Sequence, residues 1–315
     1  MPPNIIPPSA DTVITDGIWP VMLTSFLGPD QIDWAGVQAL TDFYIAQGAH
    51  GLFAACLSSE ALSLSPDNKV ELVRRVVEFA EGRVPVVGGV LGLPDRNLRT
   101  DAAATMVAAG AKAAVIPLCD LAGETDPDEV WIEEMEANLA GLGDVPLGLY
   151  ECPVPYQRFL TPALTSYLSD KPNFRFLKDT SGSIAEMQRK SEALPHLRIF
   201  SAASGNLLEA LDAGMHGFSG LQTNFWPDLL VELFECHREQ PARAAGIQDF
   251  LREYGWVEGR SYPASAKLLL RMAHNLPIQT LSFLNDASVS HEDQVWAADV
   301  IAAWRHIHLT HLSLS

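Results

Sequence analysis

The amino-acid sequence predicts a (β/α)8 barrel with a C-terminal helical extension. The first reason is that eight short, mainly apolar runs recur along the chain, most of them about 20 to 35 residues apart. The second is that the stretches between these runs have helical periodicity. Alternating strands and helices indicate a parallel sheet, and eight such units are the number that closes a barrel.

The eight predicted strands occupy residues 19–24, 51–56, 84–90, 113–118, 146–150, 174–178, 198–202 and 217–222. An open, doubly wound sheet is the alternative fold. Such a sheet usually has a glycine-rich dinucleotide-binding loop after its first strand. Residues 23–31 contain a single glycine, so the sequence favours the barrel.

The first helices are predicted between these strands. Residues 33–49 place Val37, Leu40 and Tyr44 on one face of a helix. Residues 66–82 begin after Ser65, a typical N-cap, and Pro66 suits a first helical turn because no backbone N–H is needed there.

After about residue 227 the strand pattern stops. Four helical stretches follow, at residues 227–240, 241–255, 263–276 and 290–309. We divide the chain into an extended, proline-rich N-terminal arm (1–14), the barrel (15–240) and a C-terminal helical region (241–315).

The composition limits the classes of function. The 315 residues carry a formal net charge of −18, which argues against nucleic acid or an anionic membrane surface as a partner, because phosphate binding needs clustered Lys and Arg. The N-terminus does not resemble a signal peptide, and no run of about 18 apolar residues occurs, so we expect a cytoplasmic protein without a membrane span. The four cysteines are widely spaced, so we expect no metal site.

A tyrosine and a lysine end the fifth and sixth predicted strands, at Tyr150 and Lys178. The leucine before each of them suits the side that the outer helices cover. Because strand residues alternate, Tyr150 and Lys178 should face the barrel interior, as should Phe174 and Phe176. Barrel active sites lie at the C-terminal ends of the strands, so the two groups should lie side by side at the catalytic rim.

These two groups suit one chemistry. Apolar neighbours such as Phe176 should lower the pKa of Lys178 and favour the neutral amine, which attacks a ketone or aldehyde to form a Schiff base. The resulting iminium stabilises a carbanion at the adjacent carbon, and the Tyr150 hydroxyl can transfer the protons. The alternative is that Lys178 forms a structural salt bridge with Asp179 or another acid.

Several segments, in order, resemble the dihydrodipicolinate synthase / N-acetylneuraminate lyase family of lysine-dependent enzymes. The resemblance runs from about residue 15 to about residue 275. The segments that carry it are VMLTSF (21–26), SSEALSLSPDNKVELVRR (58–75), GRVPVVGGV (82–90), LGLYECP (147–153), FLKDTSG (176–182), SGNLLEALDAGMHGFSG (204–220) and YPASAKLLL (262–270).

The resemblance implies a carbon–carbon or carbon–oxygen lyase that forms a Schiff base between Lys178 and pyruvate or a related 2-oxo acid, with Tyr150 relaying protons. It implies that Ser58 and Ser59 hold the substrate carboxylate. Gly205 and Leu221 are the further substrate-binding residues that it implies. It also implies a homo-oligomer, a tetramer or dimer, that needs neither a metal nor an organic cofactor.

The sequence departs from the family pattern around this site. Leu57 stands at the first of two usual threonines if the match is anchored at the following glutamate, and Leu118-Cys119 replaces a usual tyrosine pair. Pro155 replaces the arginine that binds a second carboxylate in the synthases, and Arg158 could substitute only if the loop differs. We therefore predict that the protein is not a true dihydrodipicolinate synthase.

Two other functions stay open from the sequence. One is a dehydratase that acts on a 2-keto-3-deoxy sugar acid through the same lysine. The other is a barrel that binds a 2-oxo acid without turnover, since the proton relay is depleted. The sequence also places an acid, Glu151, directly after Tyr150 and near the expected site.

Overall fold

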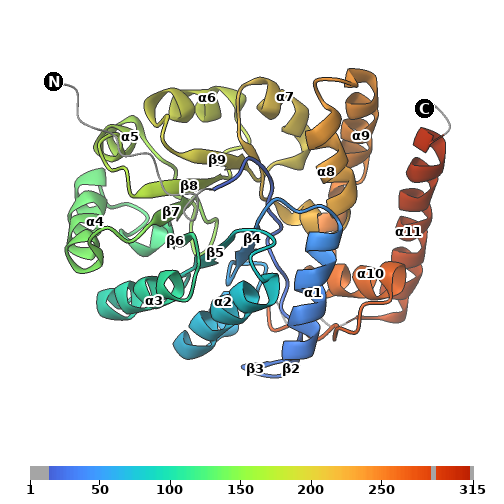
Figure 1. Ribbon diagram of the computed structural model, residues 1–315, viewed down its shortest axis with the longest axis horizontal. Coiled ribbons are helices and arrows are strands. Elements are labelled where there is room, and N and C mark those ends of the chain that lie inside the picture. Colours follow the sequence, from blue (N-terminus) through green and yellow to red (C-terminus); the bar gives the residue numbers. More distant parts are fainter. Residues whose placement is uncertain (1–13, 285–288, 313–315) are drawn as a thin grey trace.

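The computed structural model describes residues 14–284 and 289–312. Eight parallel strands form one curled sheet with helices outside it (Figure 1). In the order in which they pair, the strands are β1 (Gly17–Ile18), β10 (Gly217–Phe218), β9 (Arg198–Ser201), β8 (Phe174–Asp179), β7 (Leu147–Tyr150), β6 (Ala113–Pro117), β5 (Val86–Gly89) and β4 (Leu52–Ala54). Seven of the eight predicted strands therefore overlap strands of this sheet, the last of them being shorter than predicted. The run predicted at 19–24 instead lies just after β1 and contributes only the bridge at Val21.

Hydrogen bonds also join the two ends of the sheet. The Met22 N–H donates to the Phe53 carbonyl over 2.9 Å, and the Phe53 N–H donates to the Pro20 carbonyl over 2.9 Å. Val21 is the parallel bridge partner of Phe53. Proline has no N–H to donate, so Pro20 interrupts regular pairing, and the first strand is assigned only to Gly17–Ile18.

The helices that follow the strands begin where the sequence supplies caps. Asp33, Ser65 and Asp95 each accept a bond from the backbone N–H three residues later. The helices between strands are α1 (Trp34–Ala46), α2 (Pro66–Ala80), α3 (Arg96–Ala108), α4 (Asp128–Leu142), α5 (Pro162–Leu168), α6 (Ile184–Ala193) and α7 (Leu207–Asp212). An antiparallel hairpin, β2 (Phe26–Gly28) with β3 (Gln31–Ile32), was not predicted, since such short strands leave no alternating pattern.

The core has two parts, one inside the curled sheet and one between the sheet and the helices. Inside, the Phe176 and Phe200 rings stack with centroids 4.8 Å apart, and Trp19 packs on both. Phe174, which we predicted to face inward, instead packs in the outer part with Leu147. The reason is a shift in the β7–β8 register. Leu147 pairs with Phe174, but the next residue, Gly148, pairs with Phe176, so the inward–outward alternation of side chains is broken there.

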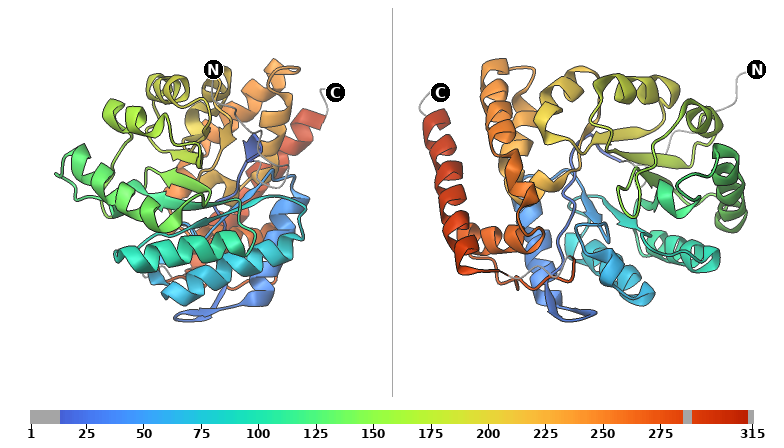
Figure 2. Two further views of the ribbon diagram at one scale, coloured as in Figure 1. Left: turned by 60° about the vertical axis from the view of Figure 1, so that its left-hand side comes forward. Right: turned by 180° about the vertical axis from the view of Figure 1, so that it is seen from behind.

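Four α-helices follow the last strand in the part of the chain that the structure describes: α8 (Pro227–Cys236), α9 (Pro241–Glu253), α10 (Ala264–His274) and α11 (His291–Leu312). The C-terminal helix α11 lies along one flank beside α10 (Figure 2). It is also tied to α8, where Asp228 Oδ2 accepts a bond from Trp304 Nε1 (3.2 Å) and lies 2.7 Å from His308 Nε2. The predicted helical extension is thus present, whereas the boundary at residue 240 stays a prediction. Within the described residues, no helix is both long and apolar enough to cross a bilayer.

Candidate active site

Lys178, the residue before the last in β8, and Tyr150, the last residue of β7, are register partners on neighbouring strands. Both side chains are buried, each 4% exposed. The Lys178 Nζ lies 4.6 Å from the centroid of the Tyr150 ring and 5.9 Å from that of Phe53. The predicted juxtaposition of an amine and a phenol at the C-terminal ends of two strands is therefore confirmed.

The Lys178 amine lies in a weakly polar environment. Burial lowers its pKa, while the nearby Cys56, Cys152 and Glu258 oppose the shift. No ion pair among the described residues includes Lys178, and the neighbouring Asp179 pairs with a different lysine. The structure therefore does not support the alternative of a salt bridge between Lys178 and Asp179.

That other lysine, Lys190 of α6, lies between two carboxylates on the outer side of the sheet. Its Nζ lies 2.5 Å from Glu151 Oε1 and 2.5 Å from Asp179 Oδ2, and all three side chains are fully buried. Since Tyr150 and Lys178 face inward, the residues that follow them face the helices. Glu151 is thus turned away from the Lys178 side, and its carboxylate joins the ends of β7 and β8.

Tyr150 is surrounded by thiols and one further phenol. Burial raises its pKa, and Cys152, Cys56 and Tyr262 raise it further, so the hydroxyl stays protonated. Cys119 and Cys152 both donate to the Val154 carbonyl, over 3.2 Å and 3.3 Å. Cys119, which replaces a usual family tyrosine, is thus buried beside this site.

The two predicted carboxylate-binding serines have different surroundings. The Ser59 hydroxyl donates to the Met22 carbonyl over 2.6 Å and accepts from the Cys56 N–H over 3.2 Å. The Ser59 hydroxyl therefore stabilises the turn that contains it. Ser58 is equally buried, and its side chain interacts with the Tyr262 hydroxyl. Of the two, Ser58 is the one whose side chain contacts Tyr262, a phenol whose charge influences Tyr150.

Tyr262 is a site residue that sequence reasoning missed. Its hydroxyl accepts a bond from Asn224 Nδ2 over 2.7 Å, and the Asn224 Oδ1 accepts from the Tyr44 hydroxyl. Burial raises the pKa of Tyr262 well above its ordinary value. Its segment, YPASAKLLL, resembles the family, but no local pattern indicates that a tyrosine there reaches the rim.

Gly205 and Leu221 lie in short 3-10 turns after β9 and β10, η4 (Ser204–Asn206) and η5 (Leu221–Asn224). Both turns are at the same end of the sheet as Lys178, and binding of the substrate by Gly205 and Leu221 stays a prediction. Glu258, which was not predicted, also belongs here, because its Oε1 accepts a bond from Ser204 Oγ over 3.4 Å.

The Arg158 guanidinium contacts the loop before α4 and the first residue of α4. Its Nη2 pairs with Asp128 Oδ1 at 2.8 Å, and its Nη1 donates to the carbonyls of Gly123 and Asp126 over 3.1 Å each. These contacts hold the loop before α4. In this arrangement Arg158 does not replace the arginine that is missing at Pro155.

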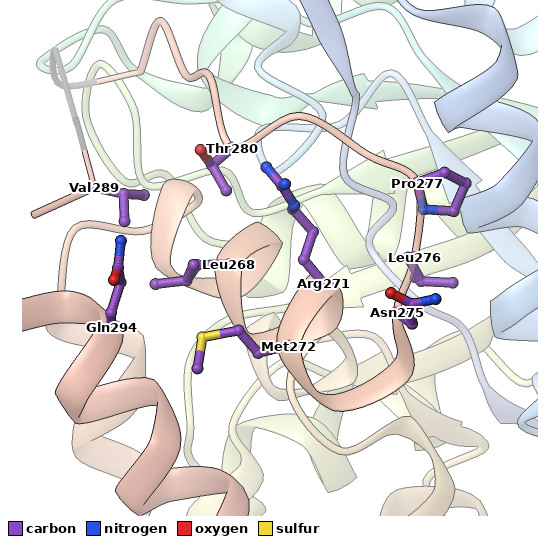
Figure 3. Close-up of a pocket in the computed structure, with 9 residues that line it drawn as sticks. All are labelled: Leu268, Arg271, Met272, Asn275, Leu276, Pro277, Thr280, Val289 and Gln294. Carbon is purple, nitrogen blue, oxygen red and sulfur yellow. The ribbon is translucent and has the colours of Figure 1, made fainter. Parts of the chain in front are cut away.

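These residues form no metal site within the described part of the chain, and they do not line the pocket beside α10 and α11. No three His, Cys, Asp or Glu side chains gather as metal ligands in the part of the chain that the structure describes. A pocket of ≈ 750 Å³ lies between α10, the segment after it and α11, where Arg271 extends toward Thr280 (Figure 3). None of the predicted site residues lines it.

Known proteins share this sequence pattern and architecture. The dihydrodipicolinate synthetase family model matches residues 15–254. The 4-hydroxy-tetrahydrodipicolinate synthase of Pseudoalteromonas atlantica is 27% identical over 226 residues, covering 70% of this chain and 74% of that protein. The N-acetylneuraminate lyase of Rhizobium meliloti is 28% identical over 222 residues, covering 70% of this chain and 72% of that protein. The crystal structure of YagE, a prophage protein of the dihydrodipicolinic acid synthase family from Escherichia coli K12, in complex with pyruvate, matches with a TM-score of 0.81 and 23% identity, covering 94% of this chain and 100% of that one.

Proposed function

The chain belongs to the dihydrodipicolinate synthetase family, an enzyme family with synthase and lyase members, and from this premise we propose that it is a Schiff-base lyase or aldolase acting on pyruvate or a related 2-oxo acid. The observation that carries the proposal is the buried amine of Lys178, which forms no ion pair within residues 14–284 and 289–312, beside the protonated hydroxyl of Tyr150. The pyruvate bound by YagE is consistent with this substrate.

The proposed reaction proceeds in four steps. The neutral Lys178 amine adds to the C2 carbonyl of the 2-oxo acid, and water leaves as the iminium forms. Loss of a proton from C3 gives an enamine, whose C3 forms a bond to the carbonyl carbon of an aldehyde. The aldehyde oxygen takes up a proton, for which Tyr150 is the proposed relay. Water then hydrolyses the iminium, which frees the product and the Lys178 amine.

Two features bear on which family activity this is. Arg158 is engaged with the loop before α4, and Pro155 stands at the arginine position, so we propose an activity other than dihydrodipicolinate synthesis. A 2-keto-3-deoxy sugar acid dehydratase and a non-catalytic 2-oxo acid binder use the same lysine, but no observation favours either. We also propose that the curled sheet is a closed (β/α)8 barrel and that the protein is a homo-oligomer, which light scattering would test.

Borohydride trapping tests the function. Incubation with pyruvate followed by reduction should add the mass of one reduced pyruvate, located at Lys178 by peptide mapping. Lys178→Ala should abolish the adduct, whereas Lys112→Ala, at a lysine after α3, should not. An adduct that persists in Lys178→Ala would disprove the Schiff-base assignment. An adduct without aldol cleavage, aldol addition or dehydration across a substrate panel would favour the non-catalytic binder.

A further inference from the structure

One carboxylate near Lys178 comes from outside the sheet. Glu258 lies in the 3-10 turn η6 (Gly255–Gly259), between α9 and α10. Its side chain is half-buried, and none of the ion pairs formed within residues 14–284 and 289–312 includes it. The adjacent cation, Arg260, pairs with Asp293 at 2.7 Å instead. Glu258 is therefore a carboxylate that no arginine or lysine of the described residues neutralises by direct contact.

Two turns at the rim hold this carboxylate. Ser204, the first residue of the turn η4 after β9, donates to Glu258 Oε1 over 3.4 Å, and the side chain of Gln222, after β10, also hydrogen-bonds to it. Lys178 on β8 is the register partner of Phe200 on β9. Since parallel strands end at one rim, these contacts place Glu258 on the Lys178 side of the sheet.

The charges of Glu258 and Lys178 influence each other. Burial raises the pKa of Glu258, and the positive charge of Lys178 opposes this. In return, the negative charge of Glu258 raises the pKa of Lys178 against burial. The other groups facing Lys178 in this way are the thiols Cys56 and Cys152, which makes Glu258 the only carboxylate among them.

We propose that Glu258 recognises the part of the substrate beyond the 2-oxo acid, and that this part carries hydroxyl groups rather than a second carboxylate. The inference rests on the proposed function and names its aldehyde partner as a hydroxyaldehyde. A carboxylate accepts hydrogen bonds through both of its oxygens, so it suits hydroxyl donors. A second substrate carboxylate would meet a like charge, and Arg158 is not available to offset it.

In this role Glu258 contacts the substrate but takes no part in bond formation. The new carbon–carbon bond joins C3 of the enamine to the aldehyde carbon, and Glu258 accepts a bond from a hydroxyl further along the aldehyde. The contact should determine which aldehyde reacts. It should not affect formation of the Schiff base between Lys178 and pyruvate.

The test compares two aldehydes that differ in one group, 3-hydroxypropanal and 3-oxopropanoate, as partners for pyruvate. The native protein should have the higher kcat/KM for the hydroxyaldehyde. Glu258→Gln should lower the ratio of the two kcat/KM values by about 10- to 100-fold, the size expected for a hydrogen bond to a charged group. Glu253→Gln, at an exposed carboxylate that ends α9, should leave the ratio unchanged. A native preference for 3-oxopropanoate, or an unchanged ratio in Glu258→Gln, overturns the inference.

Borohydride trapping with pyruvate separates this inference from the function on which it rests. If the native protein forms no adduct, the proposed function and the inference both fail. If the adduct forms but the ratio does not respond to Glu258→Gln, the inference alone fails. If circular dichroism shows that Glu258→Gln does not fold, Glu258→Asp is tested instead. It keeps the carboxylate on a side chain that is one methylene shorter. The ratio should then fall by a smaller factor, and an unchanged ratio in Glu258→Asp overturns the inference as well.

Discussion

Lys267 and Glu60, 207 positions apart in the chain, form a fully buried ion pair with Nζ and Oε1 2.6 Å apart. Glu60 also accepts bonds from the Ser282 hydroxyl (2.9 Å) and the Leu284 N–H (3.0 Å). The pair therefore fixes helix α10 and the segment after it to the turn that carries Ser58. The C-terminal region thus supports the geometry of the site as well as supplying residues to it.

We expect Lys267→Met to lower the free energy of unfolding by about 3–5 kcal/mol, because it leaves the Glu60 charge buried without its cation. Urea denaturation followed by circular dichroism measures this. Lys171→Met is the matched control, since Lys171 forms an ion pair of 2.9 Å with Glu136 at the surface, and should change stability by less than about 1 kcal/mol. Equal losses in the two variants would contradict the assigned role.

Lys190→Met should have a comparable effect, about 3–5 kcal/mol, because it leaves Glu151 and Asp179 facing each other without the intervening cation. The pKa of Glu151 is already raised by burial and by Asp179, and loss of Lys190 should raise it further. A carboxyl with a raised pKa binds protons more readily in the folded state, so the variant should be less destabilised at pH 5 than at pH 8. Adding Asp179→Asn should recover part of the loss. A deficit independent of pH would contradict this account.

The lowered pKa of Lys178 predicts the pH dependence of adduct formation. The neutral amine is the nucleophile, so the rate of trapping with pyruvate should rise with pH and level off once Lys178 is deprotonated. Because burial lowers this pKa, the midpoint should lie below the ordinary value of 10.5. Initial trapping rates between about pH 6 and pH 11 measure it. A midpoint at or above 10.5 would show that the amine is not desolvated in solution.

Tyr150→Phe should reduce kcat by about 10²- to 10⁴-fold, the usual contribution of a positioned proton-transfer group, and weaken binding of the 2-oxo acid far less. Steady-state kinetics together with pyruvate binding by calorimetry separate the two effects. Tyr167→Phe on α5 is the control and should alter neither. Equal losses in binding and turnover would remove the relay role from Tyr150.

The positions of Lys178 and Tyr150 could be predicted because they depend on short-range rules. Residues two apart in a strand face the same side, and consecutive strands of a barrel are neighbours, so two short segments suffice to place both groups. The same rule failed for Phe174, where an irregularity in the register breaks the alternation. The alternation rule also predicts that Glu151 faces outward, since Glu151 directly follows the inward-facing Tyr150.

The sequence by itself therefore determined the alternation of strands and helices and the pairing of an amine with a phenol at one rim, because these follow from periods of two and 3.6 residues. Only the tertiary structure decided that Asp179 belongs to Lys190, that Glu258 and Tyr262 reach the site, and that Lys267 holds the turn carrying Ser58. These contacts join segments distant in the chain, and which distant segments meet depends on how the helices pack. No local pattern records that packing, so the positions of Lys178 and Tyr150 could be predicted from the residues, whereas those of Glu258 and Tyr262 could not.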